Sequence, residues 1–189
     1  MRIITALSGA SGAAYGLELV RRLTQGGHEL HAVVSRYGRK VLEHECGVGA
    51  EALLPHVAAL YDNDDMTACI ASGSFRADAM VIAPCSMRTL AAVASGLAGN
   101  LMCRAADVMI KERKPLVLAV RETPLSAVHL ENMLKLARLG VCIMPLAPGF
   151  YHKPETLDDL LGMMAGRIMD NLGVPDAGIP RWRGMPGQG

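Results

Sequence analysis

The feature that most constrains this chain is a short apolar run, Leu116 to Val120, with no polar side chain on either face. Such a run predicts a parallel strand that is buried on both sides of a sheet. Arg121, Glu122 and Thr123 follow directly, and Pro124 ends the segment. Because ligands of open α/β sheets bind beyond the carboxyl ends of the strands, this charged pair is a candidate functional site.

The segment before this strand carries a second group of charged residues. Arg104, Asp107 and Lys111 are spaced at i, i+3 and i+7, which places them on one face of a helix. A solvent-exposed helix face and an ordinary strand end explain these charges equally well. The stretch alone therefore does not establish a site.

The remaining pattern alternates strands and helices. Buried strands are expected at residues 3–7, 29–34, 78–83 and 141–144, and helices at about 12–23, 36–45 and 125–139. A last helix follows the capping box Thr156-x-x-Asp159 and stops at Gly173. This alternation predicts an α/β fold with a doubly wound parallel sheet. Residues 46–77 allow no such assignment.

Length and composition predict one globular domain. The 189 residues are 51% hydrophobic and 20% charged, which suits a single core, and we expect a domain at 1–174 followed by a tail at 175–189. A net charge of +1 argues against binding to nucleic acid. Five widely spaced cysteines predict reduced thiols and a cytoplasmic protein, and no segment resembles a signal peptide or a membrane span.

Two turns between strand and helix are candidate ligand sites. Ser8-Gly-Ala-Ser-Gly12 could present backbone N–H groups to an anion, usually phosphate. Its spacing is not that of a dinucleotide fingerprint, and the second strand ends in Ser35 rather than an acidic residue, which favours a mononucleotide. In the second turn, which begins at Pro84, Ser86 and Thr89 offer hydroxyl groups but could equally be helix N-caps.

The sequence predicts no metal site. The acidic cluster at residues 62–65 lacks the glycine and distal glutamate of an EF-hand, so a solvated turn is the simpler interpretation. His129-x-Glu131 has no P-C-x-x-C to complete a zinc deaminase signature. Cys85 is interpreted as a small buried residue rather than a nucleophile.

Taken together, the motifs closely resemble the UbiX/Pad-type flavin prenyltransferase family. They run in the expected order along nearly the whole chain: Ser8-Gly-Ala-Ser-Gly12, Pro84-Cys-Ser-Met87 with Thr89, Arg104-Ala-Ala-Asp-Val, Lys111-Glu112, Arg121-Glu-Thr-Pro124, His129-Leu-Glu-Asn-Met133 and Phe150-Tyr-His. The resemblance implies a flavodoxin-like (Rossmann-like) three-layer α/β/α fold and a homo-oligomer, typically a dodecamer built from trimers. It also implies an enzyme that joins a dimethylallyl group from dimethylallyl phosphate to N5 and C6 of reduced FMN, without a metal. The prenylated FMN would then serve a UbiD-type decarboxylase.

The resemblance also implies roles for individual residues. The residues implied to bind FMN are Gly9, Ala10, Ser11, Ser35, Ser86, Met87, Arg88, Thr89 and Arg121. Those implied to bind the prenyl phosphate are Arg104, Lys111, Tyr151, Arg167 and Trp182. The catalytic set is Glu122, which would handle protons, with Ser11, Glu45 and Lys111.

Two other functions remain open at this point. Flavin-dependent cysteine decarboxylases of the related flavodoxin-like group carry a Pro-Ala-Ser-Ala-Asn-Thr turn, where this chain has Pro84-Cys-Ser-Met-Arg-Thr89. A non-catalytic FMN carrier would keep the glycine turn but would not need Lys111, Glu122, Tyr151 and Arg167, all of which are present. The tail has the Pro- and Gly-rich composition of a dispensable segment, yet the resemblance implies that Trp182 folds over the active site.

Overall fold

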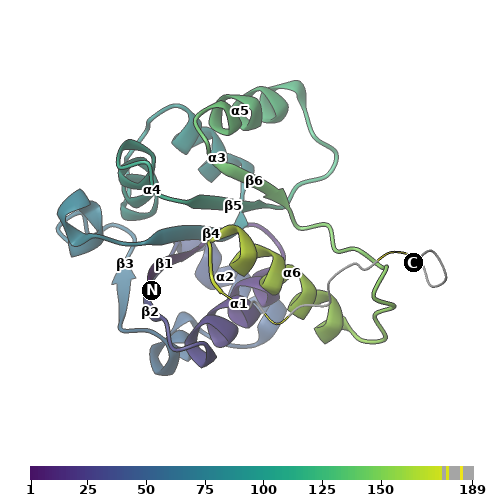
Figure 1. Ribbon diagram of the computed structural model, residues 1–189. Helices are drawn as coiled ribbons and strands as arrows, with labels where there is room; N and C mark the ends of the chain where they lie inside the picture. Colours follow the sequence, from purple (N-terminus) through teal and green to yellow (C-terminus); the bar gives the residue numbers. More distant parts are fainter. Residues whose placement is uncertain (176–177, 179–183, 185–189) are drawn as a thin grey trace.

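The computed structural model describes residues 1–175, 178 and 184, and it contains one six-stranded sheet in which every neighbouring pair is parallel (Figure 1). The strands are β1 (Arg2–Leu7), β2 (Glu29–Val34), β3 (Ala59–Asp62), β4 (Ala79–Cys85), β5 (Leu116–Val120) and β6 (Cys142–Pro145). Their order across the sheet is β3-β2-β1-β4-β5-β6. The expected doubly wound topology is confirmed.

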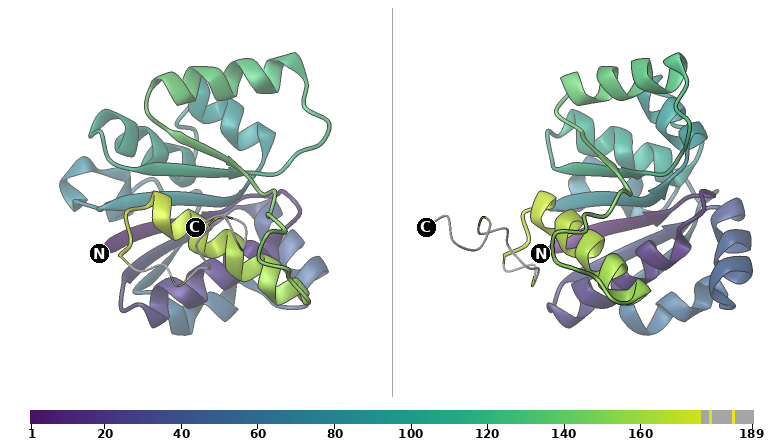
Figure 2. Two further views of the ribbon diagram at one scale, coloured as in Figure 1. Left: turned by 45° about the vertical axis from the view of Figure 1, so that its right-hand side comes forward. Right: turned by 90° about the vertical axis from the view of Figure 1, so that its right-hand side faces the viewer.

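Helices cover both faces of this sheet (Figures 1 and 2). The α-helices are α1 (Ala13–Gln25), α2 (Arg36–Cys46), α3 (Met87–Ala94), α4 (Leu101–Lys111), α5 (Ala127–Arg138) and α6 (Leu157–Asn171). Three short 3-10 helices are η1 (Ala50–His56), η2 (Cys69–Ala71) and η3 (Gly73–Phe75). Helices α3, α4 and α5 pack on one face, and α1, α2 and α6 pack on the other. The result is the three-layer α/β/α arrangement.

The strands form because their side chains are buried on both faces. Alternate residues of β1 belong to different cores: Ile4 packs with α3 and α4, whereas Ile3 packs with α1 and α6. All five residues of β5 are buried, as its apolar run predicted. None of the helices among residues 1–175 has the length and apolar character that a membrane-spanning segment requires.

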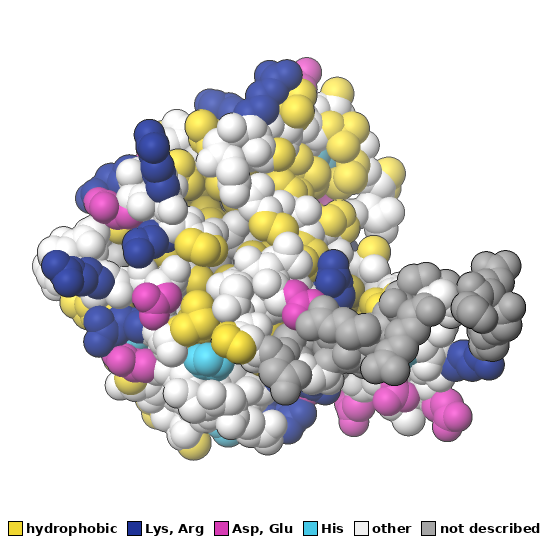
Figure 3. Space-filling model, viewed as in Figure 1, with side chains coloured by type: hydrophobic (Ala, Val, Ile, Leu, Met, Phe, Trp, Pro, Cys, Tyr) yellow, Lys and Arg dark blue, Asp and Glu magenta, His cyan; other side chains and the backbone are white. Residues whose placement is uncertain are grey.

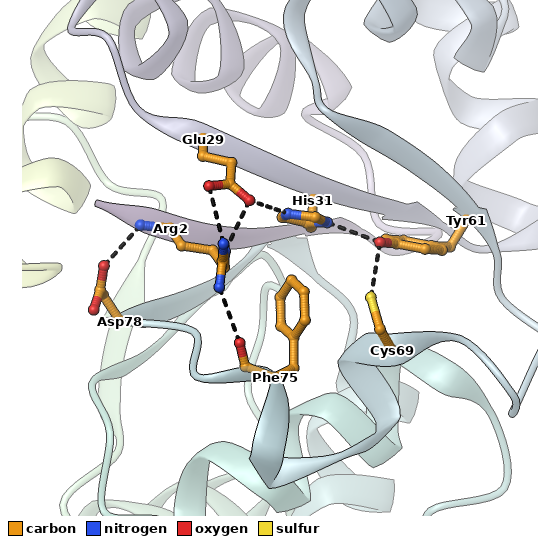
Figure 4. Close-up of polar contacts among 7 residues, drawn as sticks. All are labelled: Arg2, Glu29, His31, Tyr61, Cys69, Phe75 and Asp78. Carbon is orange, nitrogen blue, oxygen red and sulfur yellow. Dashed lines mark hydrogen bonds and ion pairs between the residues drawn. The ribbon is translucent and has the colours of Figure 1, made fainter.

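The segment between β3 and β4 is fastened to the sheet by a polar network (Figure 4). Arg2 Nε donates to Glu29 Oε1 at 2.8 Å, and His31 Nε2 lies 2.9 Å from the same oxygen. His31 Nδ1 lies 2.8 Å from the hydroxyl of Tyr61, which lies 3.1 Å from the Cys69 sulfur. The network connects β1, β2 and β3 to η2, so this stretch is ordered by contacts from distant parts of the chain.

Candidate functional site

The carboxyl ends of β1 and β4 are joined by one buried serine. Ser8 Oγ donates to the carbonyl of Pro84 at 2.8 Å and accepts from the backbone N–H of Ser86 at 2.7 Å. The Arg121 N–H donates to the Cys85 carbonyl at 3.2 Å, which adds the exit of β5. Three strand exits therefore form one continuous site, as expected for a doubly wound sheet.

The exit of β2 joins the same group. The Ser35 N–H donates to the Leu7 carbonyl at 3.0 Å, and the Ser35 hydroxyl caps α2 by accepting from Gly38 N–H. Tyr37 packs so closely on Gly9 that a Cβ atom at position 9 would lie 2.4 Å from the Tyr37 Cβ. Only glycine fits there. The turn after β1 is thus held by α2.

Glu45, on α2, occupies the N-terminus of α1. Its Oε2 accepts from the N–H groups of Gly12 at 2.8 Å and Ala13 at 2.9 Å. Gly12 has a φ of 102°, a left-handed conformation that favours glycine. The sequence pattern predicted that N–H groups of this turn bind an anion. In the structure, these two bind a carboxylate of the chain itself.

The environment of Glu45 favours its ionised form. Burial on its own raises the pKa of Glu45. Hydrogen bonds from the Ser11 hydroxyl and from the N–H groups of Ala13 and Gly12 outweigh this effect and hold the pKa below its ordinary value. The positive charge of Arg121 acts in the same direction, so Glu45 and Arg121 share one electrostatic environment.

Arg121 has an unused donor that points to a ligand. Its Nε is buried, and no described residue accepts a hydrogen bond from it. Among residues 1–175, the N–H groups of Gly9, Ala10 and Ser11 likewise have no hydrogen-bond acceptor. Because a buried donor such as the Arg121 Nε is almost always paired in folded proteins, this edge of the sheet suits a ligand with acceptor atoms, which the accessible N–H groups of the turn could also bind. An anionic cofactor fits the donor set.

The turn after β4 contributes hydroxyl groups in the same place. Ser86 Oγ caps α3 by accepting from Thr89 N–H at 3.3 Å and lies 3.1 Å from the Thr89 hydroxyl. Met87 is largely buried, whereas the Arg88 side chain is exposed. The capping role expected as an alternative is therefore real, and it fixes both hydroxyl groups beside the exits of β1 and β5.

Glu122 stands at the solvent-facing side of this group. It follows Arg121 at the exit of β5, and its side chain is exposed. Its Oε1 accepts from the Thr123 N–H at 3.1 Å, which directs the carboxylate along the loop. The adjacent β6 exit is held by Leu146 N–H, which donates to the Val120 carbonyl at 2.9 Å. The loop that carries Tyr151 begins there.

Arg104 and Lys111, which were assigned to the prenyl phosphate, both lie on α4. Arg104 donates to the Ala71 carbonyl of η2 at 3.1 Å and pairs with Asp107 at 2.7 Å. Lys111 ends α4 before β5 begins and contacts Glu112. From Leu116 to Glu122 the chain advances about 20 Å at the rise of an extended strand, so Lys111 lies far from the Glu122 carboxylate.

Arg167 is also distant from the strand exits. It pairs with Asp170 at 3.1 Å near the C-terminus of α6, and its charge acts on Cys142, the first residue of β6. Tyr151 lies on the loop after β6, with its ring packed edge-on against His152. Trp182 lies outside the described residues. Thus one copy of the chain assembles the residues assigned to FMN, but it does not bring Lys111 and Arg167 to them.

Two contributors to this site were not assigned a role from the sequence. Ser8 braces the two glycine- and serine-rich turns, and Tyr37 supports Gly9. A serine directly after an otherwise apolar strand was the available signal for Ser8. No local pattern marks Tyr37, because its contact joins two different strand exits. Among the described residues, no three His, Cys, Asp or Glu side chains are grouped as metal ligands.

Known proteins are similar to this chain in both sequence and structure. Residues 1–169 match the Flavoprotein family. A probable UbiX-like flavin prenyltransferase from Streptomyces sp. (strain D7) is 46% identical over 186 residues, which cover 98% of this chain and 93% of the relative. The crystal structure of AnUbiX in complex with FMN and dimethylallyl pyrophosphate is 40% identical, with a TM-score of 0.95 and coverage of 97% of this chain and 98% of that one. A dodecameric FMN-dependent Ubix-like decarboxylase from Escherichia coli O157:H7 is 41% identical, with a TM-score of 0.94 and coverage of 97% and 100%.

Proposed function

The chain belongs to the UbiX-like flavin prenyltransferases of the flavoprotein family, and on that premise we propose that it joins a dimethylallyl group to N5 and C6 of reduced FMN. The observation that carries this proposal is the unpaired, buried Nε of Arg121 beside the free N–H groups of Gly9 to Ser11. These donors suit an anionic, acceptor-rich molecule such as FMN. A solved structure of the same fold has FMN and dimethylallyl pyrophosphate bound.

The residues that would hold FMN come from four strand exits. They are Gly9, Ala10 and Ser11 after β1, Ser35 after β2, Ser86 to Thr89 after β4, and Arg121 after β5. Reduced FMN supplies the electron-rich ring atoms that accept the allyl group. Since Glu45 binds the first N–H groups of α1, the phosphate of FMN would be held by the remaining donors of these turns. Arg121 would supply the positive charge.

The departing phosphate needs positive charge and a proton. Cations placed at the departing oxygens stabilise the charge that develops there, most strongly in a site that excludes water. Glu122, which follows Arg121 at the exit of β5 and is exposed, would deliver the proton. Lys111, Arg104, Tyr151 and Arg167 would bind the phosphate oxygens. Ser11 and Glu45 would act as a hydrogen-bonded pair beside the flavin.

Because Lys111 and Glu122 are distant within one chain, we propose that two copies share each site. One copy would contribute the strand exits with Glu122, and the neighbour would contribute the cations of α4. A dodecameric relative of the same fold supports a homo-oligomer of this kind. We further propose that the prenylated FMN passes to a UbiD-type decarboxylase and that the protein works in the cytoplasm.

Mass analysis of the flavin product tests this function. Purified protein is incubated anaerobically with reduced FMN and either dimethylallyl phosphate or dimethylallyl diphosphate, and the extracted flavin is weighed by mass spectrometry. We expect a flavin that has gained one prenyl unit, and the two parallel reactions identify the donor. Reactions with oxidised FMN, or without a donor, serve as controls. Unmodified flavin with both donors would overturn the proposal.

A further inference from the structure

Helix α5 has a second apolar side that faces away from the core. Met133 and Leu136 are buried against the sheet, as expected for a helix in an outer layer. Away from the core, Leu130 and Leu134 are 52% and 51% exposed, and Leu139, directly after the helix, is 58% exposed. Single exposed leucines are common, but Leu134 and Leu139 line one hollow together, which suggests a contact. Figure 3 shows apolar and charged side chains next to each other where α5 lies, at the top of the molecule.

Charges of opposite sign lie at the two ends of this surface. Glu131 lies one turn before Leu134, and Lys135 and Arg138 lie in the last turn. Within the described part of the chain, none of these three charged residues forms an ion pair. A shallow hollow of about 390 Å³ is lined by Glu131, Leu134, Lys135, Arg138 and Leu139. The surface is therefore acidic towards its start, apolar at its centre and basic towards its end.

Such a surface is complementary to a second copy of itself that is related to it by a twofold rotation. Two α5 helices packed antiparallel, with Leu134 near the twofold axis, would place Glu131 of each copy opposite Arg138 of the other. Each contact then occurs twice, as in any isologous interface. We propose that the outer face of α5 is a twofold contact with a second copy of this chain.

The symmetry of a twelve-subunit assembly supports a second copy of the chain as the partner of this α5 surface. The proposed shared site joins two different surfaces, α4 of one copy and the strand exits of another. A contact of this heterologous kind produces a ring of subunits when it closes on itself. Apart from a single twelve-membered ring, every closed arrangement of twelve identical subunits also contains twofold axes. A single helix pair covers less than the roughly 1,000 Å² of an independent interface, so it would join rings that the other contact has already formed. The relative of 41% identity is dodecameric.

A charge swap tests the contact and its register. Glu131→Arg and Arg138→Glu are made singly and together, and molar mass is measured by light scattering after size exclusion and by native mass spectrometry. Either single change sets like charges opposite each other twice, so we expect the molar mass to fall to half of the wild-type value or less. The double variant should restore the wild-type mass. Glu43→Arg is the matched control, because the Glu43 side chain on α2 is exposed, and this change should leave the mass unchanged.

Leu134→Ser provides a second test without charge and should also lower the mass. Thermal unfolding followed by circular dichroism checks that each variant is folded, which is expected because all the substituted side chains are exposed. Unchanged mass in both single charge variants would show that α5 does not join copies of this chain. Failure of the double variant to reassemble, with both single variants folded and dissociated, would exclude the antiparallel register.

Discussion

At the scale of residues, Glu45 occupies the helix N-terminus at which the glycine- and serine-rich turn predicts a phosphate. A glycine- and serine-rich turn before a helix suggests a phosphate site, because the first N–H groups of a helix attract anions. Here the anion is the Glu45 carboxylate, which accepts from Gly12 and Ala13. Hydrogen bonds from the Ser11 hydroxyl and from these two N–H groups, with the charge of Arg121, hold its pKa below the ordinary value although partial desolvation opposes them. A ligand at this edge of the sheet therefore meets a fixed negative charge as well as free donors.

Glu122 should govern the rate of prenyl transfer rather than the binding of FMN. Glu122→Gln keeps the size and the hydrogen bond to Thr123 but removes the proton-carrying group. We expect turnover to fall by about 100-fold to 10,000-fold, the range for a lost general acid or base. FMN affinity, measured by fluorescence titration, should stay close to wild type. Wild-type turnover in this variant would remove Glu122 from the mechanism.

The acid stability of the protein should depend on Glu29. Its hydrogen bond from Arg2, with a smaller effect from His31, lowers its pKa to about 2 from an ordinary value of 4.5. A depressed carboxyl pKa stabilises the fold above the ordinary pKa, and this contribution is lost as the pH falls through the folded-state value. The difference in free energy of unfolding between wild type and Glu29→Gln should thus be largest above pH 4.5 and vanish near pH 2.

Urea unfolding at a series of pH values measures this difference. Glu43→Gln is the control, since Glu43 is exposed and forms no ion pair within residues 1–175. A difference that stays constant between pH 4.5 and pH 2 would mean that the Arg2–Glu29 contact does not stabilise the native state.

At the scale of elements, sequence patterns correctly predicted the strands whose bounds are set by their own residues. The strand at residues 29–34 and the strand at 116–120 have the predicted bounds, because continuous apolar runs between turns have few other uses. The strand β3 was missed. It is a four-residue edge strand with half-buried side chains, and it is held by pairing with β2 and by the Tyr61–His31 contact. Neither contact leaves a periodic signal in residues 46–77.

Helix α4 shows the corresponding limit for the site. The spacing of Arg104, Asp107 and Lys111 correctly predicted one helix face, and Arg104 pairs with Asp107. It did not predict where that face points, since the position of a helix on a sheet depends on packing over long distances. The residues at the strand exits were easier to group, because the carboxyl ends of neighbouring parallel strands necessarily meet.

Mixed oligomers should reveal whether α4 serves a neighbouring copy. Lys111→Ala and Glu122→Gln are each expected to be slow, but co-expression of the two variants should recover activity. If each site takes Lys111 from one copy and Glu122 from another, about a quarter of the sites in a random equal mixture carry both native residues. Recovery to about that fraction, measured by prenylated-flavin formation, would support a shared site. Activity no higher than that of the separate variants would place both residues in one copy.

At the scale of the whole molecule, the buried core of the described chain ends at Val174. Val174 is the last buried side chain of the described chain, and its N–H donates to the Met169 carbonyl at 3.0 Å. It packs in the layer formed by α1, α6 and one face of the sheet. All six strands, and the residues at their exits, precede this point. The residues that we assign to FMN therefore all lie before residue 176.

Truncation after Pro175 should consequently separate folding from catalysis. Since no buried side chain among the described residues is removed, we expect the free energy of unfolding to change by less than about 1 kcal/mol, as for surface changes generally. FMN titration should also be unchanged. Prenyl transfer should be slower, because the family resemblance assigns Trp182 to the substrate, and Trp182→Ala in the full chain should lower the rate to a similar extent. Full activity in both variants would show that this segment has no part in the reaction, whereas a loss of FMN binding on truncation would place part of the flavin site beyond Pro175.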